Sequence, residues 1–226
     1  MITTSYNYNL TAHNTFAMKV KCSCFMEYTN PEDIPFMLST IRKDVDWFHI
    51  GGGSNLLFTS DFSGVIFHSA IKGKEIISET EDTILIKVGA GEVMDELIEW
   101  ACDYGYWGLE NLSGIPGEVG ASAVQNVGAY GIEAGDVITK VYAFDTINRE
   151  FISIEKKDCQ FGYRTSLFKQ PDEKGRYVIH AVEYLLSKVS APKIEYPALA
   201  ARFSGMNTEN ITPHIVRNEI ISIRNS

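Results

Sequence analysis

GLENLSGIPGEVGASAVQNVGAYG, residues 108–131, is the stretch that decides the fold of this chain. Six of its residues are glycines, interleaved with alanines and serines. Residues this small add little to a hydrophobic core, so the stretch favours a place where a ligand comes close to the backbone. Its polar members Ser122, Gln125, Asn126 and Tyr130 could form hydrogen bonds with the edges of a large planar ring. Tight packing of backbone on backbone is the alternative that stays open.

A second glycine-rich stretch, HIGGGSNLLF at residues 49–58, lies between two apolar runs. A tight hairpin turn needs only about two such residues. The run Gly51-Gly52-Gly53-Ser54-Asn55 instead favours a loop that turns several N–H groups toward one anion, typically a phosphate. It is not a Rossmann fingerprint, because Leu56 stands where the third glycine belongs and no amphipathic helix follows. The chain also lacks the G-K-[ST] end of a Walker A loop.

Composition limits the partners that we expect. The formal net charge of −9 argues against nucleic acid, and a phosphate would have to be held by backbone N–H groups and a few placed cations. The four cysteines and five histidines show no metal-ligand spacing, so we expect free thiols and no metal. The opening MITTSYNYNL has no secretory signal pattern, and no apolar run reaches membrane-spanning length, so we expect no membrane partner.

The order of predicted elements indicates an α+β protein. Apolar periodicity predicts a helix capped by Asn30 over 30–43, a helix over 92–104 and a last helix that opens at Thr212. Strands are expected over 45–50, 83–91 and 176–186, with a hairpin over 137–154 that turns near 146–148. The stretch 56–70 reads as strand, turn, strand.

The motifs resemble those of a known family. GGGSNLLF (51–58), residues 108–131, CQFGYRTSLFK (159–169) and HNTFAMKV (13–20) look like the signature segments of the UDP-N-acetylenolpyruvoylglucosamine reductases. These flavoenzymes complete UDP-N-acetylmuramate for the bacterial cell wall. The resemblance implies the two-subdomain FAD-binding fold of the vanillyl-alcohol oxidase type. Residues 1–70 would form the smaller subdomain, 71–190 the larger one, and 191–226 the start of a truncated substrate domain.

The resemblance also implies a cofactor site between the two subdomains. FAD would be bound non-covalently, because Ser54 follows the glycine pair where many oxidases of this fold carry the histidine that links FAD. Gly51, Gly52, Gly53, Ser54 and Asn55 would hold the pyrophosphate, and Leu56 would also contact the cofactor. The adenosine and the flavin would contact Ile115, Pro116, Gly117, Gly120, Ala121, Ser122, Gln125, Asn126, Ala129 and Gly131. We expect a valine at Gly53 to weaken FAD binding more than folding.

The family's chemistry gives further residues a role. NADPH would donate the electrons, and the substrate would be a UDP-linked sugar that carries an enolpyruvyl ether. Arg164 matches the arginine that stabilises negative charge near the substrate carboxylate, and Tyr130 and Tyr163 would lie near the substrate. Tyr196 matches a loop tyrosine that closes over the UDP end. A surface ion pair for Arg164 and a packed core position for Tyr196 are the open alternatives.

The sequence departs from the family after the last helix. The family's proton-donor serine, an assisting glutamate and a lysine follow that helix, whereas these residues end at IRNS. We therefore expect the chain to lack the proton donor and to be incomplete for turnover. An FAD-dependent oxidase of the same fold and a flavin-binding module without catalysis stay open as alternatives. The expected setting is cytoplasmic synthesis of peptidoglycan precursors by a monomer.

Overall fold

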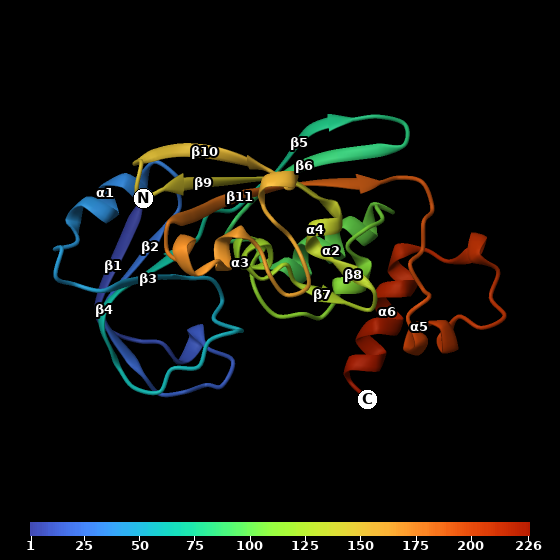
Figure 1. Cartoon of the computed structure of the whole chain (residues 1–226). Coiled ribbons are helices and arrows are strands. Elements are labelled where there is room, and N and C mark those ends of the chain that lie inside the picture. Colours follow the sequence, from blue (N-terminus) through green and yellow to red (C-terminus); the bar gives the residue numbers. More distant parts are fainter.

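The computed structural model describes all residues from Met1 to Ser226 and contains two sheets that lie side by side (Figure 1). The first sheet consists of β1 (Ile2–Asn9), β2 (Lys21–Tyr28), β3 (Trp47–Ile50) and β4 (Phe62–Ser69). Its order is β1-β2-β4-β3, with β1 antiparallel to β2 and the other three strands parallel. Helix α1 (Asp33–Thr40) connects β2 with β3 and is shorter than the expected 30–43. The predicted cap Asn30 is wrong, because Glu32 occupies the N-cap position and no side chain caps this helix.

The glycine-rich loop connects two parallel neighbours, β3 and β4. A connection between parallel neighbours has to travel back along the strands, so residues 51–61 cannot form a hairpin. The expected strand over Phe62–Ser69 is confirmed, but the strand expected at 56–58 is wrong for this reason. The loop leaves β3 at its carboxyl end, which is the edge where ligands bind in parallel sheets.

The second sheet is antiparallel and carries most of the core. Its strands, in the order β10-β9-β11-β6-β5, are β10 (Glu150–Glu155), β9 (Ile138–Asp145), β11 (Tyr177–Ser187), β6 (Thr83–Gly89) and β5 (Lys74–Glu79). The predicted hairpin and the strands over 83–91 and 176–186 are confirmed within a few residues. Helices α2 (Met94–Asp103), α3 (Val119–Gln125) and α4 (Ala134–Val137) lie on one face of this sheet (Figure 1). A cluster of 25 buried residues fills the space between them.

The small-residue stretch forms a helix, which the sequence did not predict. Helix α3 occupies Val119–Gln125, and a short two-stranded ribbon, β7 (Gly128–Ala129) with β8 (Ile132–Glu133), follows it. A Cβ placed on Gly120 would lie 2.9 Å from the Cβ of Ala90, closer than side chains approach one another. Gly120 therefore lets α3 pack against the end of β6, so tight packing explains part of this stretch.

The last segment contains α5 (Pro197–Arg202) and α6 (Pro213–Arg224). Thr212 caps α6, as predicted, because its hydroxyl accepts a hydrogen bond from the N–H of Ile215 at 3.3 Å. Arg217 of α6 forms two hydrogen bonds with Asp95 of α2, at 2.6 and 2.9 Å. This ion pair ties the C-terminal helix to the helical layer of the second sheet (Figure 1).

The two sheets contact each other through one apolar cluster. It consists of Tyr28, Ile34, Met37, Phe67, Ile71, Phe144 and Val178, which come from both sheets, from α1 and from the connection between β4 and β5. All four cysteines are buried free thiols. None of the helices combines the length and the apolar content that crossing a membrane requires.

Candidate cofactor-binding site

A cavity of about 690 Å³ lies between the glycine-rich loop, α3 and the first residues of β11. A volume of this size is typical of a cavity for a cofactor-sized ligand. Most residues that the sequence assigns to FAD line it: Gly51, Gly53, Ser54, Asn55, Leu56, Ile115, Pro116, Gly117, Gly120, Ala121, Ser122 and Gln125. The fold thus brings two stretches that are about 60 residues apart in sequence to one cavity.

The glycine-rich loop offers a row of hydrogen-bond donors without partners. No backbone N–H from Gly52 to Leu56 donates to a protein acceptor. Gly53 is buried, and a buried N–H needs a partner. On the facing segment, the N–H groups of Glu118 and Ala121 are also unpaired. Such converging donors fit the diphosphate of a dinucleotide.

Gly53 is required for the fold of the loop, and not for direct contact with a ligand. Its φ is +70°, and a Cβ there would lie 1.8 Å from the backbone oxygen of His13. The side chain of a valine at this position would therefore collide with the segment between β1 and β2, not with the cavity. This contact reverses the expectation from the sequence, because we now expect folding to suffer first.

Gly53→Ala is accordingly expected to lower the melting temperature of the apoprotein, because an L-residue at this φ costs about 1–3 kcal/mol even before the collision is counted. Gly52→Ala is the matched control, because the nearest atom to a Cβ there is Oε1 of Glu118, at an ordinary 3.7 Å. Thermal unfolding of both variants without FAD checks the difference. Equal melting temperatures would contradict the role given to Gly53.

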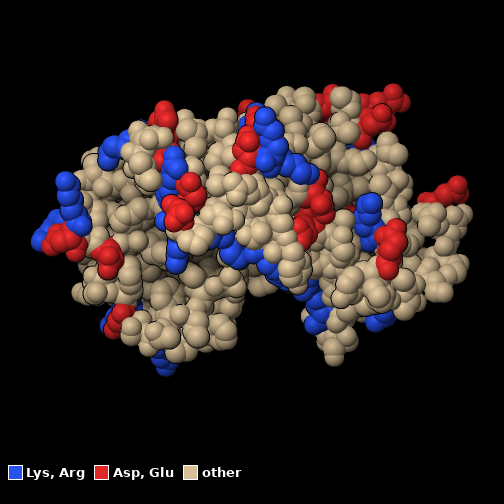
Figure 2. Space-filling model, viewed as in Figure 1, with Lys and Arg blue, Asp and Glu red and all other residues tan.

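The opposite wall of the cavity carries three cations, Arg164, Lys169 and Lys174. Lys169 donates hydrogen bonds to Oε1 of Gln125 at 2.9 Å and to the backbone oxygen of Arg164 at 2.8 Å. The side chains of Arg164 and Lys174 form no ion pair with the protein. Figure 2 shows basic side chains along the upper margin of the notch in the lower half of this acidic molecule. The cations can therefore face an anionic ligand.

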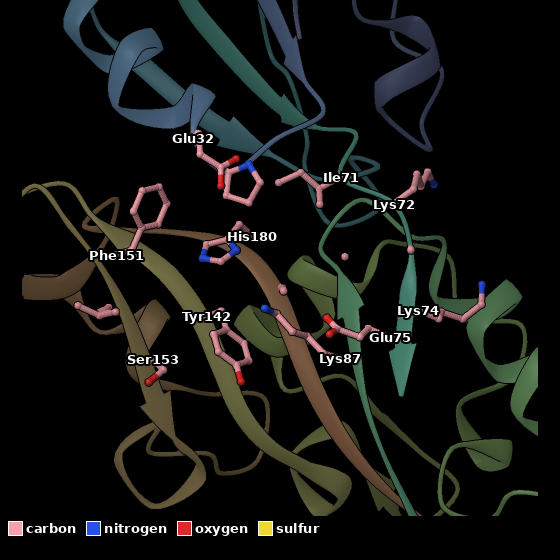
Figure 3. A pocket seen from close by; sticks show the side chains of 15 residues that line it. Glu32, Ile71, Lys72, Lys74, Glu75, Lys87, Tyr142, Phe151, Ser153 and His180 are labelled. Atoms are coloured by element: carbon pink, nitrogen blue, oxygen red, sulfur yellow. The ribbon is translucent and has the colours of Figure 1, made fainter. Parts of the chain in front are cut away.

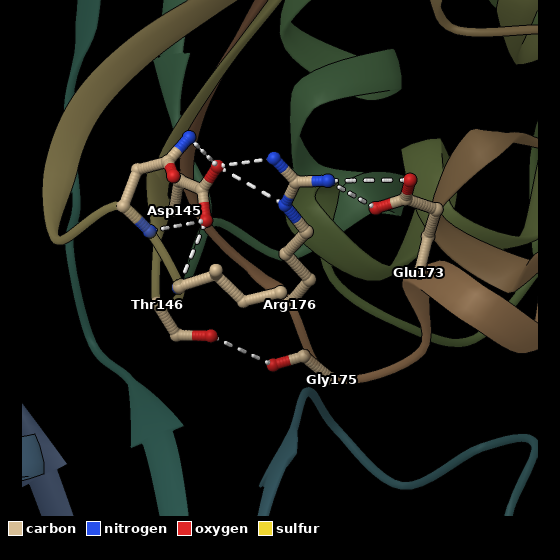
Figure 4. A network of polar contacts seen from close by, with 7 residues as sticks. Asp145, Thr146, Glu173, Gly175 and Arg176 are labelled. Atoms are coloured by element: carbon tan, nitrogen blue, oxygen red, sulfur yellow. Dashed lines mark hydrogen bonds and ion pairs between the residues drawn. The ribbon is translucent and has the colours of Figure 1, made fainter.

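A polar network holds the segment that carries Lys174 (Figure 4). Arg176 donates to Oδ2 of Asp145 at 2.7 and 3.0 Å, and it pairs with Glu173 at 3.0 Å. Asp145 is almost fully buried, and its hydrogen bond with Arg176 lowers its pKa. Gly175 and Tyr177 on either side of Arg176 line the cavity. The network fixes this wall against the turn of the β9–β10 hairpin.

Four residues that the sequence assigns to FAD do not line the cavity: Gly52, Asn126, Ala129 and Gly131. Asn126 is fully buried, and its amide donates to Glu133 and to the oxygen of Gly162 while accepting from Gly135 N–H. Its side chain therefore connects the end of α3 to the loop before Arg164, so it acts on the site indirectly.

The three tyrosines assigned to the substrate lie outside the cavity. Tyr130 and Tyr196 contact each other edge to face, with ring centroids 5.4 Å apart, and Arg224 lies over the ring of Tyr130. Tyr163 is 85% exposed beside Arg164. Among the residues assigned to the substrate, only Arg164 lines the cavity.

Several residues that line the cavity were not predicted from the sequence, and Lys174 and Glu118 are two charged ones among them. Lys174 lies in a polar loop where no motif distinguishes it. Glu118 stands inside the decisive stretch, but no pattern shows that its carboxylate would face the glycine-rich loop, 3.2 Å from a Cβ built on Gly51. Only the packing of α3 against that loop reveals this contact.

A second hollow of about 630 Å³ lies on the other face of the large sheet (Figure 3). Lys87 stands over the ring of Tyr142, 4.3 Å from its centroid, beside Phe151 and His180. Burial, and then the charge of Lys87, lower the pKa of His180 to about 4. This hollow has no glycine-rich loop with unpaired N–H groups, so the cavity beside Gly53 is the better site for a dinucleotide.

The sequence model of the FAD binding domain matches residues 23–146, more than half of the chain. The chain belongs to the FAD-binding domain family. This FAD-binding chain is 41% identical over 217 residues to UDP-N-acetylenolpyruvoylglucosamine reductase of Bacteroides fragilis strain YCH46. It is 40% identical over 225 residues to the reductase of Neisseria meningitidis serogroup B strain MC58. These alignments cover 96% and 98% of the chain, respectively, and 64% of each relative, so the chain spans about two thirds of their length.

Solved structures agree with the fold of this FAD-binding chain. The UDP-N-acetylenolpyruvylglucosamine reductase of Thermus caldophilus superposes with a TM-score of 0.70 at 20% identity, covering 100% of this chain and 70% of that one. Cholesterol oxidase of Brevibacterium sterolicum gives 0.58 at 13% identity, covering 82% of this chain and 38% of the oxidase. The expected two-subdomain fold of the vanillyl-alcohol oxidase type and the resemblance to the reductases are thus confirmed. About a third of the relatives' length has no counterpart in these residues.

Proposed function

We propose that this chain is the FAD-binding part of an enzyme that reduces UDP-N-acetylglucosamine enolpyruvate to UDP-N-acetylmuramate, with NADPH as electron donor. The observation that carries the proposal is the single cavity in which unpaired N–H groups of the glycine-rich loop face the cations Arg164, Lys169 and Lys174. The reductase relatives, about 40% identical, support the choice of reaction.

Bound FAD would supply the hydride chemistry, and the chain's own residues would bind it and set the charge around it. The N–H groups from Gly52 to Leu56 would hold the diphosphate, and the apolar side chains of Leu56, Ile115 and Met94 would cover its planar parts. Arg164 would stabilise the negative charge that develops beside the substrate carboxylate. Its side chain lines the cavity and has no ion-pair partner that would compete for this role.

The finer assignments belong to the same proposal. Tyr130, Tyr163 and Tyr196 would approach the UDP-linked substrate only after a rearrangement, since none of them lines the cavity. The division into 1–70, 71–190 and 191–226, a monomeric state and a cytoplasmic setting without a membrane partner are part of this proposal, because the resemblance to the reductases implies them. The charge of −9 argues against a nucleic-acid partner.

The purified chain is expected to be yellow and to release its flavin when acid denatures it, because no histidine follows Gly52-Gly53 to form a covalent link. The measurement is the absorbance of supernatant and pellet after acid precipitation. Flavin that stays in the pellet would contradict non-covalent binding. A colourless protein that cannot be reconstituted with FAD would overturn the proposed function.

A further inference from the structure

A buried histidine lies beneath the glycine-rich loop, between two carboxylates. His68, at the end of β4, is 8% exposed. Its Nδ1 lies 2.9 Å from Oε2 of Glu27, and its Nε2 lies 2.9 Å from Oε1 of Glu118. A neutral imidazole has only one N–H, so one of its nitrogens would face a carboxylate oxygen without a proton between them. The geometry therefore requires the doubly protonated, cationic form of His68 while both carboxylates are ionised.

Glu118 connects this cation to the candidate cofactor site. Its carboxylate lines the cavity and lies 3.2 Å from a Cβ built on Gly51 and 3.7 Å from one built on Gly52. A carboxylate beside a loop that binds a diphosphate would repel it, unless a cation neutralises the carboxylate. His68 is the only cation in the chain that pairs with Glu118.

We propose that His68 is a positioning residue for the cofactor, which keeps Glu118 neutralised and hydrogen-bonded away from the FAD diphosphate, so that loss of the His68 proton weakens FAD binding. The inference rests on the proposed function, because it needs a diphosphate in the loop at Gly51–Asn55.

The surroundings of His68 favour its charged form near neutral pH. Burial opposes the charge, but the hydrogen bonds and charges of Glu118 and Glu27 outweigh it and raise the pKa of His68. His13, from the segment after β1, faces the ring at 5.0 Å between centroids, and burial and then His68 lower the pKa of His13. His13 therefore stays neutral and does not compete for Glu27.

The remaining groups around the pair do not titrate near neutral pH. Burial lowers the pKa of His49 to about 4, and His49 bonds Tyr28 at 2.8 Å. Burial, followed by the charge of Glu27, raises the pKa of Tyr8, whose hydroxyl lies 3.2 Å from Nε2 of His13. Burial also raises the pKa of Tyr28. His68 is thus the group whose titration changes the charge beneath the loop.

The sign of the pH dependence follows from these charges. A histidine with a raised pKa keeps its proton to a higher pH than a free imidazole and loses it as the pH rises through that pKa. FAD affinity should then fall as the pH rises through the pKa of His68. We expect the dissociation constant to rise roughly tenfold between about pH 6 and about pH 9, the effect of one uncompensated charge near the diphosphate.

The test is the dissociation constant of FAD, from quenching of flavin fluorescence, across this pH range for matched variants of the whole chain. Glu118→Gln removes the repelling charge and should bind FAD equally well at all pH values. His68→Gln should bind weakly at all pH values, and the double variant should recover the lost affinity. Glu27→Gln leaves the cavity untouched and should move the fall in affinity to lower pH, because it removes one of the carboxylates that hold the proton.

His180→Gln serves as the control, because it replaces another buried histidine on the far face of the large sheet. It should leave the pH profile of the original chain unchanged, and thermal unfolding of each apoprotein reports any loss of folding. A pH-dependent affinity that persists in Glu118→Gln, or an affinity of the original chain that does not change with pH, would overturn the inference alone. A chain that binds no FAD at any pH would overturn the proposed function as well.

Discussion

A protein made of residues 1–226 is expected to bind FAD and yet to reduce UDP-N-acetylglucosamine enolpyruvate roughly 10²–10⁴-fold more slowly than a relative as long as the Bacteroides fragilis reductase. Hydride addition to the enol ether leaves a carbanionic centre beside a carboxylate. That centre would have to be protonated by a positioned acid, and we propose that residues 1–226 do not supply it. Arg164 cannot serve, because a guanidinium does not give up its proton near neutral pH.

The hydroxyl groups of Ser54 and Ser122, the two serines of the glycine-rich stretches that line the cavity, are already engaged. Ser54 donates its hydroxyl proton to the backbone oxygen of Pro116 at 3.0 Å, and Ser122 donates to that of Val119 at 2.7 Å. Neither proton points freely into the cavity. The third of the relatives' length that has no counterpart here is where a donor and a further wall of the substrate cleft would be found.

The measurement is anaerobic. Bound FAD is reduced chemically, the enolpyruvyl substrate is added, and the return of the oxidised absorbance is followed beside a reductase of the relatives' length. Return at the same rate, with one equivalent of UDP-N-acetylmuramate formed, would show that an acid within residues 1–226 does the protonation.

The second large effect concerns Arg164, tested in a protein long enough to turn over. Arg164→Ala is expected to slow reduction of the enolpyruvyl substrate roughly a hundredfold and to leave reduction of FAD by NADPH nearly unchanged. Negative charge beside the substrate carboxylate develops only in the first of these reactions. The fold should tolerate the change, because the exposed Arg164 side chain pairs with no carboxylate of the protein.

Stopped-flow measurement of each half-reaction separates the two effects. Lys174→Ala is the matched control, because it removes another cation from the same wall and should not reproduce the selective loss. Arg164→Lys should recover only part of the rate, since an ammonium keeps the charge but not the planar, two-pronged donor. Equal loss in both half-reactions would mean that Arg164 serves binding or folding.

The sequence predicted those helices and strands that bury one face against a single neighbouring layer, because their apolar residues then recur at regular intervals. Strand β11, the β9–β10 hairpin and helices α2 and α6 are of this kind, and their periodicity is visible without knowledge of the fold. Helix α3 is different, because it is built from small residues. These are needed for close packing of Gly120 against Ala90, which is about 30 positions away in the chain. No local pattern contains that contact.

The site was predictable to the extent that the backbone forms it. Glycine-rich stretches predict loops whose backbone a ligand can approach closely. Twelve of the sixteen residues assigned to FAD do line the cavity. Charged side chains were less predictable, because their roles depend on neighbours from other elements. Glu118 and His68 are 50 residues apart, and Lys174 owes its position to Arg176 and Asp145. In the same way, the buried amide of Asn126 forms hydrogen bonds with other residues of the protein and is not free to bind a ligand.

The position of the cavity between the two sheets affects how long the protein persists in the cell. One wall belongs to the first sheet and its loop, the other to the second sheet and its helices. The two halves also meet through a cluster of seven buried side chains and through hydrogen bonds such as that between His68 and Glu118. A ligand that contacts both walls stabilises the two halves against separation. At a free concentration a hundredfold above its dissociation constant, it adds about 2.7 kcal/mol to the free energy of unfolding. Newly made chains would then need FAD to reach their full stability. In a cell short of flavin, proteolysis would lower the amount of this protein even while its synthesis continued.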